Sequence, residues 1–111
     1  MRHTISMLVN GQTLHPQRVF YALGSLPRRQ IIAFLSQTAL STADLAERFR
    51  MSRPAVSRHL SVLQRAGLIS GKRHGQRVLY RLRRDALLGA LARFASEVDG
   101  PLHYRNPRDA I

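Results

Sequence analysis

Two helix-start signals in the middle of the chain limit its fold more than any other feature. Ser41 is a good N-cap, and Asp44 three residues later can complete a capping box. Ser52 is a second N-cap, and Pro54 follows in the first helical turn, where proline is tolerated. The helix that begins after Ser41 must therefore be short, and residues 50–52 form a tight connection to the next helix. We expect two consecutive helices with a tight turn between them.

The second of these helices has one narrow apolar face. Val56, Leu60 and Leu63 follow one another at helical spacing and predict a buried stripe. Gly67 ends the helix in the left-handed conformation, which glycine adopts at little cost. The opposite face is polar and is expected to meet solvent; it consists of Pro54, Ser57, Arg58, Ser61 and Arg65. A short helix followed by one that is polar on its exposed side is typical of a helix-turn-helix.

The rest of the chain predicts three more helices and one hairpin. Pro16 and Pro27 each suit the first turn of a helix. After Gly67 the period changes: residues 68–69 and 78–82, with a turn at 71–75, predict a two-stranded hairpin. We therefore expect a mainly α (α+β) fold, a winged helix-turn-helix in the order α-α-α-α-β-β-α.

The last helix is expected to begin near Asp85, whose charge suits a helix N-terminus, and to stop before Gly100. Residues 15–99 then form one winged helix domain. Residues 1–14 show no clean period and are expected to be a loosely ordered N-terminal arm. Residues 100–111 are expected to be a C-terminal tail.

The charge of the chain and its placement indicate a nucleic-acid partner. Eighteen Lys and Arg residues oppose six Asp and Glu, a formal net charge of +12, and all but one of the cations are arginine. Residues 48–84 hold eleven of these cations and no acid, whereas an ordinary solvated surface mixes signs. Arginine favours phosphate and guanine, because its planar fork binds both in bidentate fashion.

Several classes of protein are excluded or disfavoured by composition. The absence of cysteine excludes disulfides, thiolate metal sites and thiol redox switches. The apolar stretch at residues 5–9 is too short for a signal peptide or a membrane span, so we expect a cytoplasmic protein with no membrane partner. No nucleophile–base pair, phosphate loop or paired carboxylate is recognisable, so we expect no enzymatic activity.

The candidate DNA contacts lie at the start of the second helix and at the tip of the hairpin. Arg53 and Arg58 can form paired hydrogen bonds to guanine, while Ser57 and Ser61 can bond base edges or phosphates. The glycine-bounded, basic hairpin tip suits a wing that contacts flanking phosphates. The predicted DNA-binding residues are Ser41, Thr42, Ser52, Arg53, Pro54, Ser57, Arg58, His59, Ser61, Lys72, Arg73, His74, Gln76 and Arg77.

Residues 19–98 resemble the ArsR family of bacterial winged-helix repressors. The most specific match is the segment Ser52-x-Pro-Ala-Val-Ser-x-His-Leu-x-x-Leu63, and further matches lie at residues 19–23, 28–32, 41–46, 66–69, 73–77 and 80–82. The resemblance implies a transcriptional repressor that binds double-stranded DNA at an inverted repeat, and autoregulation is one option. Whether a small-molecule effector controls it is left open.

The resemblance also implies a homodimer that forms through the first and last helices. The apolar residues of these helices support this, although they could instead belong only to the core of one chain. The predicted interface residues are Val19, Phe20, Leu23, Leu87, Leu88, Leu91, Phe94 and Val98.

The chain departs from the family at the sensor. Metal-sensing members carry a cysteine pair where this chain has residues 43–47, Ala-Asp-Leu-Ala-Glu, so we assign no metal and no cofactor. A zinc- or nickel-responsive repressor that uses His3, His15 or His103 with a carboxylate stays an alternative. A nonspecific architectural DNA-binding protein and an RNA-binding module are further alternatives. The helix predicted after Ser52 has no aromatic residue on its polar face that could stack on RNA bases, which weighs against RNA as the partner.

Overall fold

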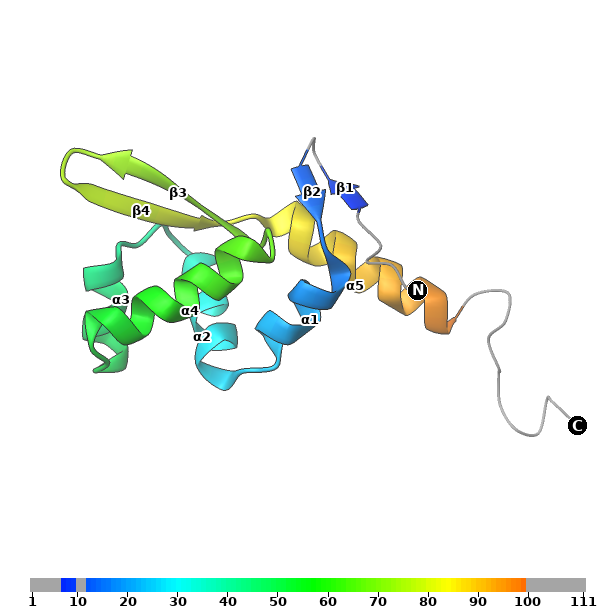
Figure 1. Ribbon diagram of the computed structural model, residues 1–111, viewed down its shortest axis with the longest axis horizontal. Coiled ribbons are helices and arrows are strands. Elements are labelled where there is room, and N and C mark those ends of the chain that lie inside the picture. The colour runs from blue at the N-terminus through cyan, green and yellow to red at the C-terminus, as the bar shows by residue number, and fades with distance from the viewer. Residues whose placement is uncertain (1–6, 10–11, 100–111) are drawn as a thin grey trace, which may run out of the picture.

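The computed structural model describes residues 7–9 and 12–99, and within them five helices and two separate antiparallel hairpins (Figure 1). From residue 16 onward the order is α-α-α-α-β-β-α, as predicted. The elements are β1 (Met7–Val9), β2 (Gln12–Leu14), α1 (Pro16–Leu23), α2 (Leu26–Leu35), α3 (Thr42–Phe49), α4 (Arg53–Arg65), β3 (Ile69–His74), β4 (Arg77–Leu82) and α5 (Arg84–Val98).

Local capping signals fix the ends of the central helices. At the start of α3 the Asp44 backbone N–H donates to the Ser41 hydroxyl over 3.1 Å, and the Ser41 N–H donates to the Asp44 carboxylate over 3.0 Å. At the start of α4 the Ala55 N–H donates to the Ser52 hydroxyl over 3.2 Å. Gly67 follows α4 with φ +81°, in the left-handed region. Both predicted N-caps and the predicted terminator are confirmed.

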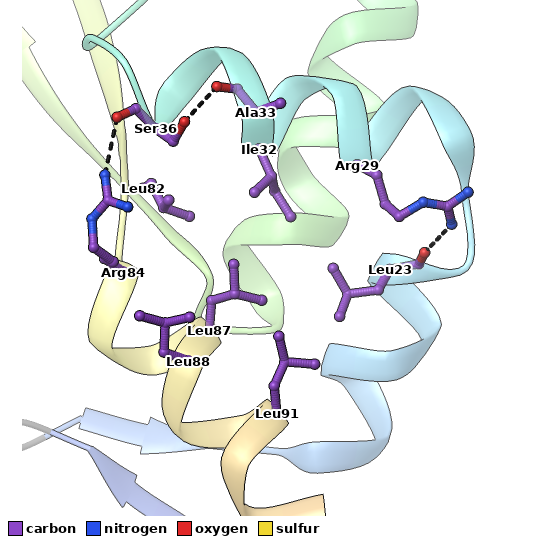
Figure 2. Close-up of a pocket in the computed structure, with 10 residues that line it drawn as sticks. All are labelled: Leu23, Arg29, Ile32, Ala33, Ser36, Leu82, Arg84, Leu87, Leu88 and Leu91. Carbon is purple, nitrogen blue, oxygen red and sulfur yellow. Dashed lines mark hydrogen bonds between the residues drawn. The ribbon is translucent and has the colours of Figure 1, made fainter. Parts of the chain in front are cut away.

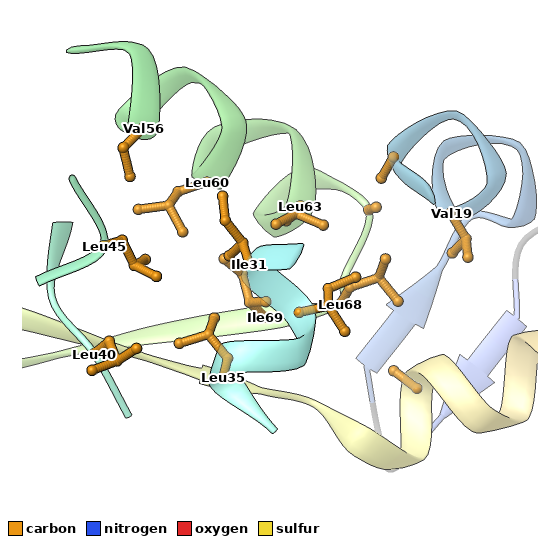
Figure 3. Packing of buried hydrophobic residues seen from close by; sticks show 14 of the residues in the cluster. Val19, Ile31, Leu35, Leu40, Leu45, Val56, Leu60, Leu63, Leu68 and Ile69 are labelled. Carbon is orange, nitrogen blue, oxygen red and sulfur yellow. The ribbon is translucent and has the colours of Figure 1, made fainter. Parts of the chain in front are cut away.

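The core lies where α2, α3 and α4 meet the base of the β3–β4 hairpin, and it extends to buried residues of α1 and α5 (Figure 3). Val56, Leu60 and Leu63 are at most 1% exposed, which confirms the predicted stripe of α4. They pack in one cluster with Ile31 of α2 and Leu45 of α3. A fully buried aliphatic side chain of this size stabilises a fold by about 1.5–3 kcal/mol, so this cluster holds α4 in place and leaves its polar face outside.

The β3–β4 hairpin is longer than the sequence indicated. Its register runs from the pair Ile69–Leu82 to the pair His74–Arg77, so only residues 75 and 76 connect the strands. The turn predicted at 71–75 was therefore wrong by several residues. Gly75, with φ +64°, is the glycine that the tight turn requires. Gly71 lies within β3 opposite Tyr80, where an added Cβ would come within 3.0 Å of the Tyr80 ring, so it serves close packing instead.

The hairpin is attached to the start of α3. Leu40 and Tyr80 exchange two backbone hydrogen bonds, of 3.1 Å and 2.8 Å, and form an isolated antiparallel bridge. In Figure 1 the free end of the hairpin projects from the domain on the side of α3, while α5 lies toward the other end. The bridge therefore fixes the hairpin beside the two central helices.

The N-terminal segment contains two short strands that the sequence analysis did not anticipate. β1 and β2 pair with Met7 opposite Leu14, and β1 lies against α5 (Figure 1). The two residues between them in the sequence are Asn10 and Gly11, a dipeptide that favours hairpin turns and could have predicted the pairing. The predicted tail at 100–111 lies outside the described residues. Within the described part of the chain, no helix is long and apolar enough to span a membrane.

Candidate nucleic-acid interface

Helix α4 presents a polar face built on a buried one. Since Val56 is fully buried, Arg58, two residues further along the helix, lies on nearly the opposite side and is exposed. Arg53, Pro54 and Ser57 are also exposed, and Ser61 is half-buried. The structure thus brings the predicted residues of the first helical turns together on one surface.

The start of α3 contributes less than predicted. Ser41 is buried, and its hydroxyl is engaged in the capping box, so its side chain is not available to a nucleic acid. Thr42, the first helical residue, is half-buried. Ser41 therefore orients α3, and the structure removes it from the set of surface contacts.

The hairpin supplies a second basic surface. Lys72, Arg73, His74, Gln76 and Arg77 are all exposed, as expected of a wing that contacts phosphates.

Arg77 also holds the wing against α3. Its guanidinium lies 3.3 Å from the Asp44 carboxylate, which is the carboxylate of the α3 capping box. The hydrogen bond from the Ser41 backbone is the main cause that lowers the pKa of Asp44, and the positive charges of Arg77 and Arg48 lower it further. The carboxylate is thus ionised at neutral pH and can pair with the wing.

A cleft of about 240 Å³ lies where the two surfaces meet. The start of α3, the first residue of α4 and the base of the wing line it; its residues are Ser41, Thr42, Ala43, Arg53, Gln76, Arg77, Val78 and Tyr80. Arg53 and Arg77 give it two positive charges, and within the described part of the chain no Asp or Glu lines it. Such a cleft suits a phosphate group.

A buried arginine that the sequence analysis did not single out connects α4 to α1. Arg28 is only 9% exposed, and its guanidinium donates to the backbone carbonyls of Tyr21 (3.1 Å) and Ala22 (2.8 Å). It also lies 3.3 Å from Nδ1 of His59 on α4 and stacks over the Tyr21 ring. Since arginine only donates hydrogen bonds, His59 accepts through Nδ1. His59, which the sequence placed among the predicted DNA-binding residues, is therefore a packing residue of α4.

Burial is the main cause that lowers the pKa of His59, and the nearby charges of Arg28 and Arg58 lower it further. The folded protein binds a proton at His59 less readily than the unfolded chain does. We therefore expect the free energy of unfolding to be highest above pH 6.5, the ordinary pKa, and to fall as the pH drops from there toward the lowered pKa of the folded state.

Urea unfolding between about pH 7.5 and 5.5 measures this effect. A His59→Gln variant keeps a neutral polar side chain that does not titrate in this range. In this variant the free energy of unfolding should therefore depend less on pH than in the wild type. Asp44 titrates below 3.8 in the folded protein and does not contribute in this window. An identical dependence of the free energy of unfolding on pH in wild type and variant would show that the pKa of His59 is not lowered by folding.

The predicted dimer residues divide into three groups by their exposure. Val19 is fully buried in the core of its own chain, so it is not available to a partner, and the structure removes it from the interface. Leu23 and Leu87 are half-buried. The other five are exposed large hydrophobic residues: Phe20 (38%), Leu88 (54%), Leu91 (41%), Phe94 (50%) and Val98 (61%). The rings of Phe20 and Phe94 meet edge to face at 5.2 Å, which joins α1 and α5 into one apolar surface.

No group of three or more His, Cys, Asp or Glu that could hold a metal ion occurs among residues 7–9 and 12–99. His3 and His103, two of the histidines considered as ligands, lie outside the described residues. Asp44, on the helix that carries the cysteine pair in metal-sensing members, is engaged in the capping box and with Arg77.

A short helix, a second helix with a polar outer face and a basic hairpin beside it define a winged helix-turn-helix domain. The family model "Bacterial regulatory protein, arsR family" matches residues 27–70. The transcriptional repressor SdpR of Bacillus subtilis is 38% identical over 69 residues, which cover 62% of this chain and 77% of SdpR. The arsenic resistance transcriptional regulator ArsR1 of Pseudomonas putida is 30% identical over 90% of this chain and 78% of its own length.

A solved structure shows the same fold. The homodimeric winged helix-turn-helix DNA-binding domain of Mb0332 from Mycobacterium bovis superposes with a TM-score of 0.62 and 28% identity, over 81% of this chain and 85% of that one. Together with the sequence matches, this shows that the chain belongs to the ArsR family of bacterial transcriptional regulators.

Proposed function

We propose that this chain is a sequence-specific transcriptional repressor that binds an inverted-repeat operator in double-stranded DNA as a homodimer. The observation that carries the proposal is the joint surface of α4 and the wing. The exposed side chains of Arg53, Ser57 and Arg58 lie on a helix whose other face is fully buried, beside a basic hairpin that the Leu40–Tyr80 bridge attaches next to α3. Helices of this kind enter the major groove with their N-terminal residues foremost.

The two surfaces take different roles. Arg58 and Ser57 reach base edges in the groove and supply specificity. The wing residues Lys72 and Arg73 neutralise flanking phosphates and supply much of the affinity. Arg53 lines the cleft with Arg77, and this position supports a phosphate contact at the border between the two surfaces.

The exposed apolar surface of α1 and α5 supports the dimer. Phe20, Phe94 and Val98 are large hydrophobic residues that one chain leaves open to solvent, and a two-fold partner would cover them. A two-fold dimer presents two α4 helices, so its operator is an inverted repeat with half-sites about one helical turn, or a multiple of it, apart.

The remaining assignments follow from this role. We assign the chain no enzymatic activity, because members of its family are regulators. A regulator of bacterial genes acts in the cytoplasm, where bacterial DNA lies. Autoregulation would follow if the operator lies near the gene of the chain itself.

Selection of genomic DNA fragments by the purified protein tests the proposal, with zinc and with a chelator in parallel. We expect one inverted-repeat motif, bound about 10³- to 10⁷-fold more tightly than random DNA. A reporter gene behind the selected site should be expressed less when the protein is present. Broad, salt-sensitive binding without a motif would instead identify an architectural protein, and binding that requires zinc would identify a metal-responsive one.

The wing assignment predicts a change in salt dependence. Replacing Arg73 by alanine removes one phosphate contact, so the slope of log affinity against log salt should fall by about 0.9 on operator and random DNA alike. Affinities at several salt concentrations measure it. Arg93→Ala is the matched control, because Arg93 lies on α5 beside Glu97, away from the wing. Equal slopes for Arg73→Ala and wild type would show that this residue does not contact the DNA backbone.

A further inference from the structure

A pocket of about 460 Å³ lies beside the first turns of α5, and none of its lining residues belongs to α3 or α4 (Figure 2). The residues come from α1, α2, the end of β4 and α5, with Ser36 at the C-terminal end of α2. They are Leu23, Arg29, Ile32, Ala33, Ser36, Leu82, Arg84, Leu87, Leu88 and Leu91. Its volume lies in the usual range for sites that bind small molecules, about 300–1,000 Å³.

The walls of the pocket are apolar. Seven of the ten lining residues carry hydrocarbon side chains, and five of these seven are leucines, so an aliphatic group would find contacts on several sides. Figure 2 shows Leu87, Leu88 and Leu91 of α5 facing Ile32 of α2 across the space. Ala33 is the smallest lining side chain and is exposed, so it leaves room on the α2 side.

Two arginines stand at opposite ends of this pocket (Figure 2). Arg84, the first residue of α5, donates to the Ser36 carbonyl oxygen over 3.0 Å, and Arg29 donates to the Leu23 carbonyl oxygen. Each of these two hydrogen bonds occupies one nitrogen of a guanidinium, which has five N–H donors in all. Among the residues that the structure describes, no Asp or Glu lines the pocket. The pocket thus combines an apolar interior with positive charge at its ends.

We propose that this pocket binds an amphipathic carboxylate with an unbranched aliphatic tail. The tail lies among the leucines, and the carboxylate binds the free N–H groups of Arg84 in the bidentate way that arginine favours. Arg84 also lies in the first turn of α5, where the helix dipole favours a negative charge. A molecule with an aliphatic tail of the same length but without a charged group lacks the contact with Arg84 and binds more weakly.

The position of the pocket makes its ligand an effector. Leu82 is the last residue of the wing strand β4, and Leu88 and Leu91 belong to the proposed dimer surface. A ligand that contacts all three residues would influence how the wing and α5 are positioned relative to each other. Its differential affinity for the free and the DNA-bound arrangement would change the affinity for DNA. Only this effector role rests on the proposed function, since binding itself does not.

Calorimetric titration of the purified chain with decanoate tests the site, with decanol and decyltrimethylammonium as uncharged and cationic controls. We expect saturable binding of one decanoate per chain, at least about tenfold tighter than either control, because a charge-assisted hydrogen bond is lost in both. Ala33→Trp fills the pocket without changing any charge and should abolish binding. Arg84→Gln should weaken binding about tenfold or more, and Arg18→Gln, a matched arginine removal outside the pocket, should not.

The outcomes separate the proposal from its alternatives. Decanoate binding that survives Ala33→Trp would reflect general attraction to a chain of charge +12 and would overturn the site. Decanoate that binds only monomers would show that the partner's side chains fill the pocket in the dimer, and would overturn it too. The affinity for the selected DNA is measured first without decanoate, which tests the proposed function alone. A DNA affinity that then stays constant at saturating decanoate would overturn the effector role.

Discussion

A Phe94→Glu variant is expected to be monomeric at concentrations where the wild-type protein is a dimer. Phe94 is half-exposed on one chain and lies against Phe20 in the apolar surface formed by α1 and α5. In a two-fold dimer the substitution places two unpaired carboxylates in the interface. Leaving a charge buried without a partner costs about 3–5 kcal/mol, so the dissociation constant should rise more than about a hundredfold. Sedimentation equilibrium measures it.

Loss of the dimer should also weaken operator binding, because each monomer reads only one half-site. A Leu26→Glu variant is the matched control. Leu26 is a large hydrophobic residue that is 58% exposed, but it lies at the start of α2, outside the α1–α5 surface. Leu26→Glu should therefore sediment as wild type does. A Phe94→Glu protein that stays folded and dimeric would refute the proposed interface.

The helices could be predicted from sequence because their signals are local. A serine that caps the third backbone N–H after it acts within four residues, so Ser41 and Ser52 mark the starts of α3 and α4 whatever surrounds them. The buried apolar stripe of α4 is also a local signal, because its residues follow one another at helical spacing. These signals were sufficient to identify the polar face of α4 on which the candidate site is built.

The extent of the wing could not be predicted in the same way. β3 has no apolar alternation after Ile69, and five of its six residues are exposed, so its pairing with β4 rather than its own composition makes it a strand. The sequence predicts Gly71 as part of a turn, whereas in the structure its lack of a side chain makes room for the Tyr80 ring.

Contacts between distant residues account for the other differences. The role of Arg28 depends on His59, 31 positions along the chain, and no local pattern reveals this contact. Val19 fits an interface by its spacing on α1, and only the packed structure shows that it belongs to the core. Sequence patterns thus predict a candidate site, while the positioning of its residues required the three-dimensional contacts.

Specificity is expected to depend on Arg58 more than on any other single side chain of α4. Its guanidinium is exposed on the face opposite Val56, near the end of the helix that enters the groove, and the two adjacent hydrogen-bond acceptors of guanine match its geometry. Arg58→Ala should therefore lower the discrimination at one base pair of each half-site by about 1–3 kcal/mol, or about 5- to 150-fold. Affinities for the operator, for its single-base variants and for random DNA measure the effect.

Arg65→Ala is the control that separates base reading from charge. Arg65 is exposed on the same face of α4, two turns further from the leading end, and it carries the same charge as Arg58. Its loss should reduce binding to all sequences by a similar, small factor. If Arg58→Ala also weakened operator and random DNA equally, Arg58 would be a phosphate contact. The source of specificity would then have to be sought in Ser57 or in the shape of the DNA itself, because a contact to phosphate carries no direct information about the base.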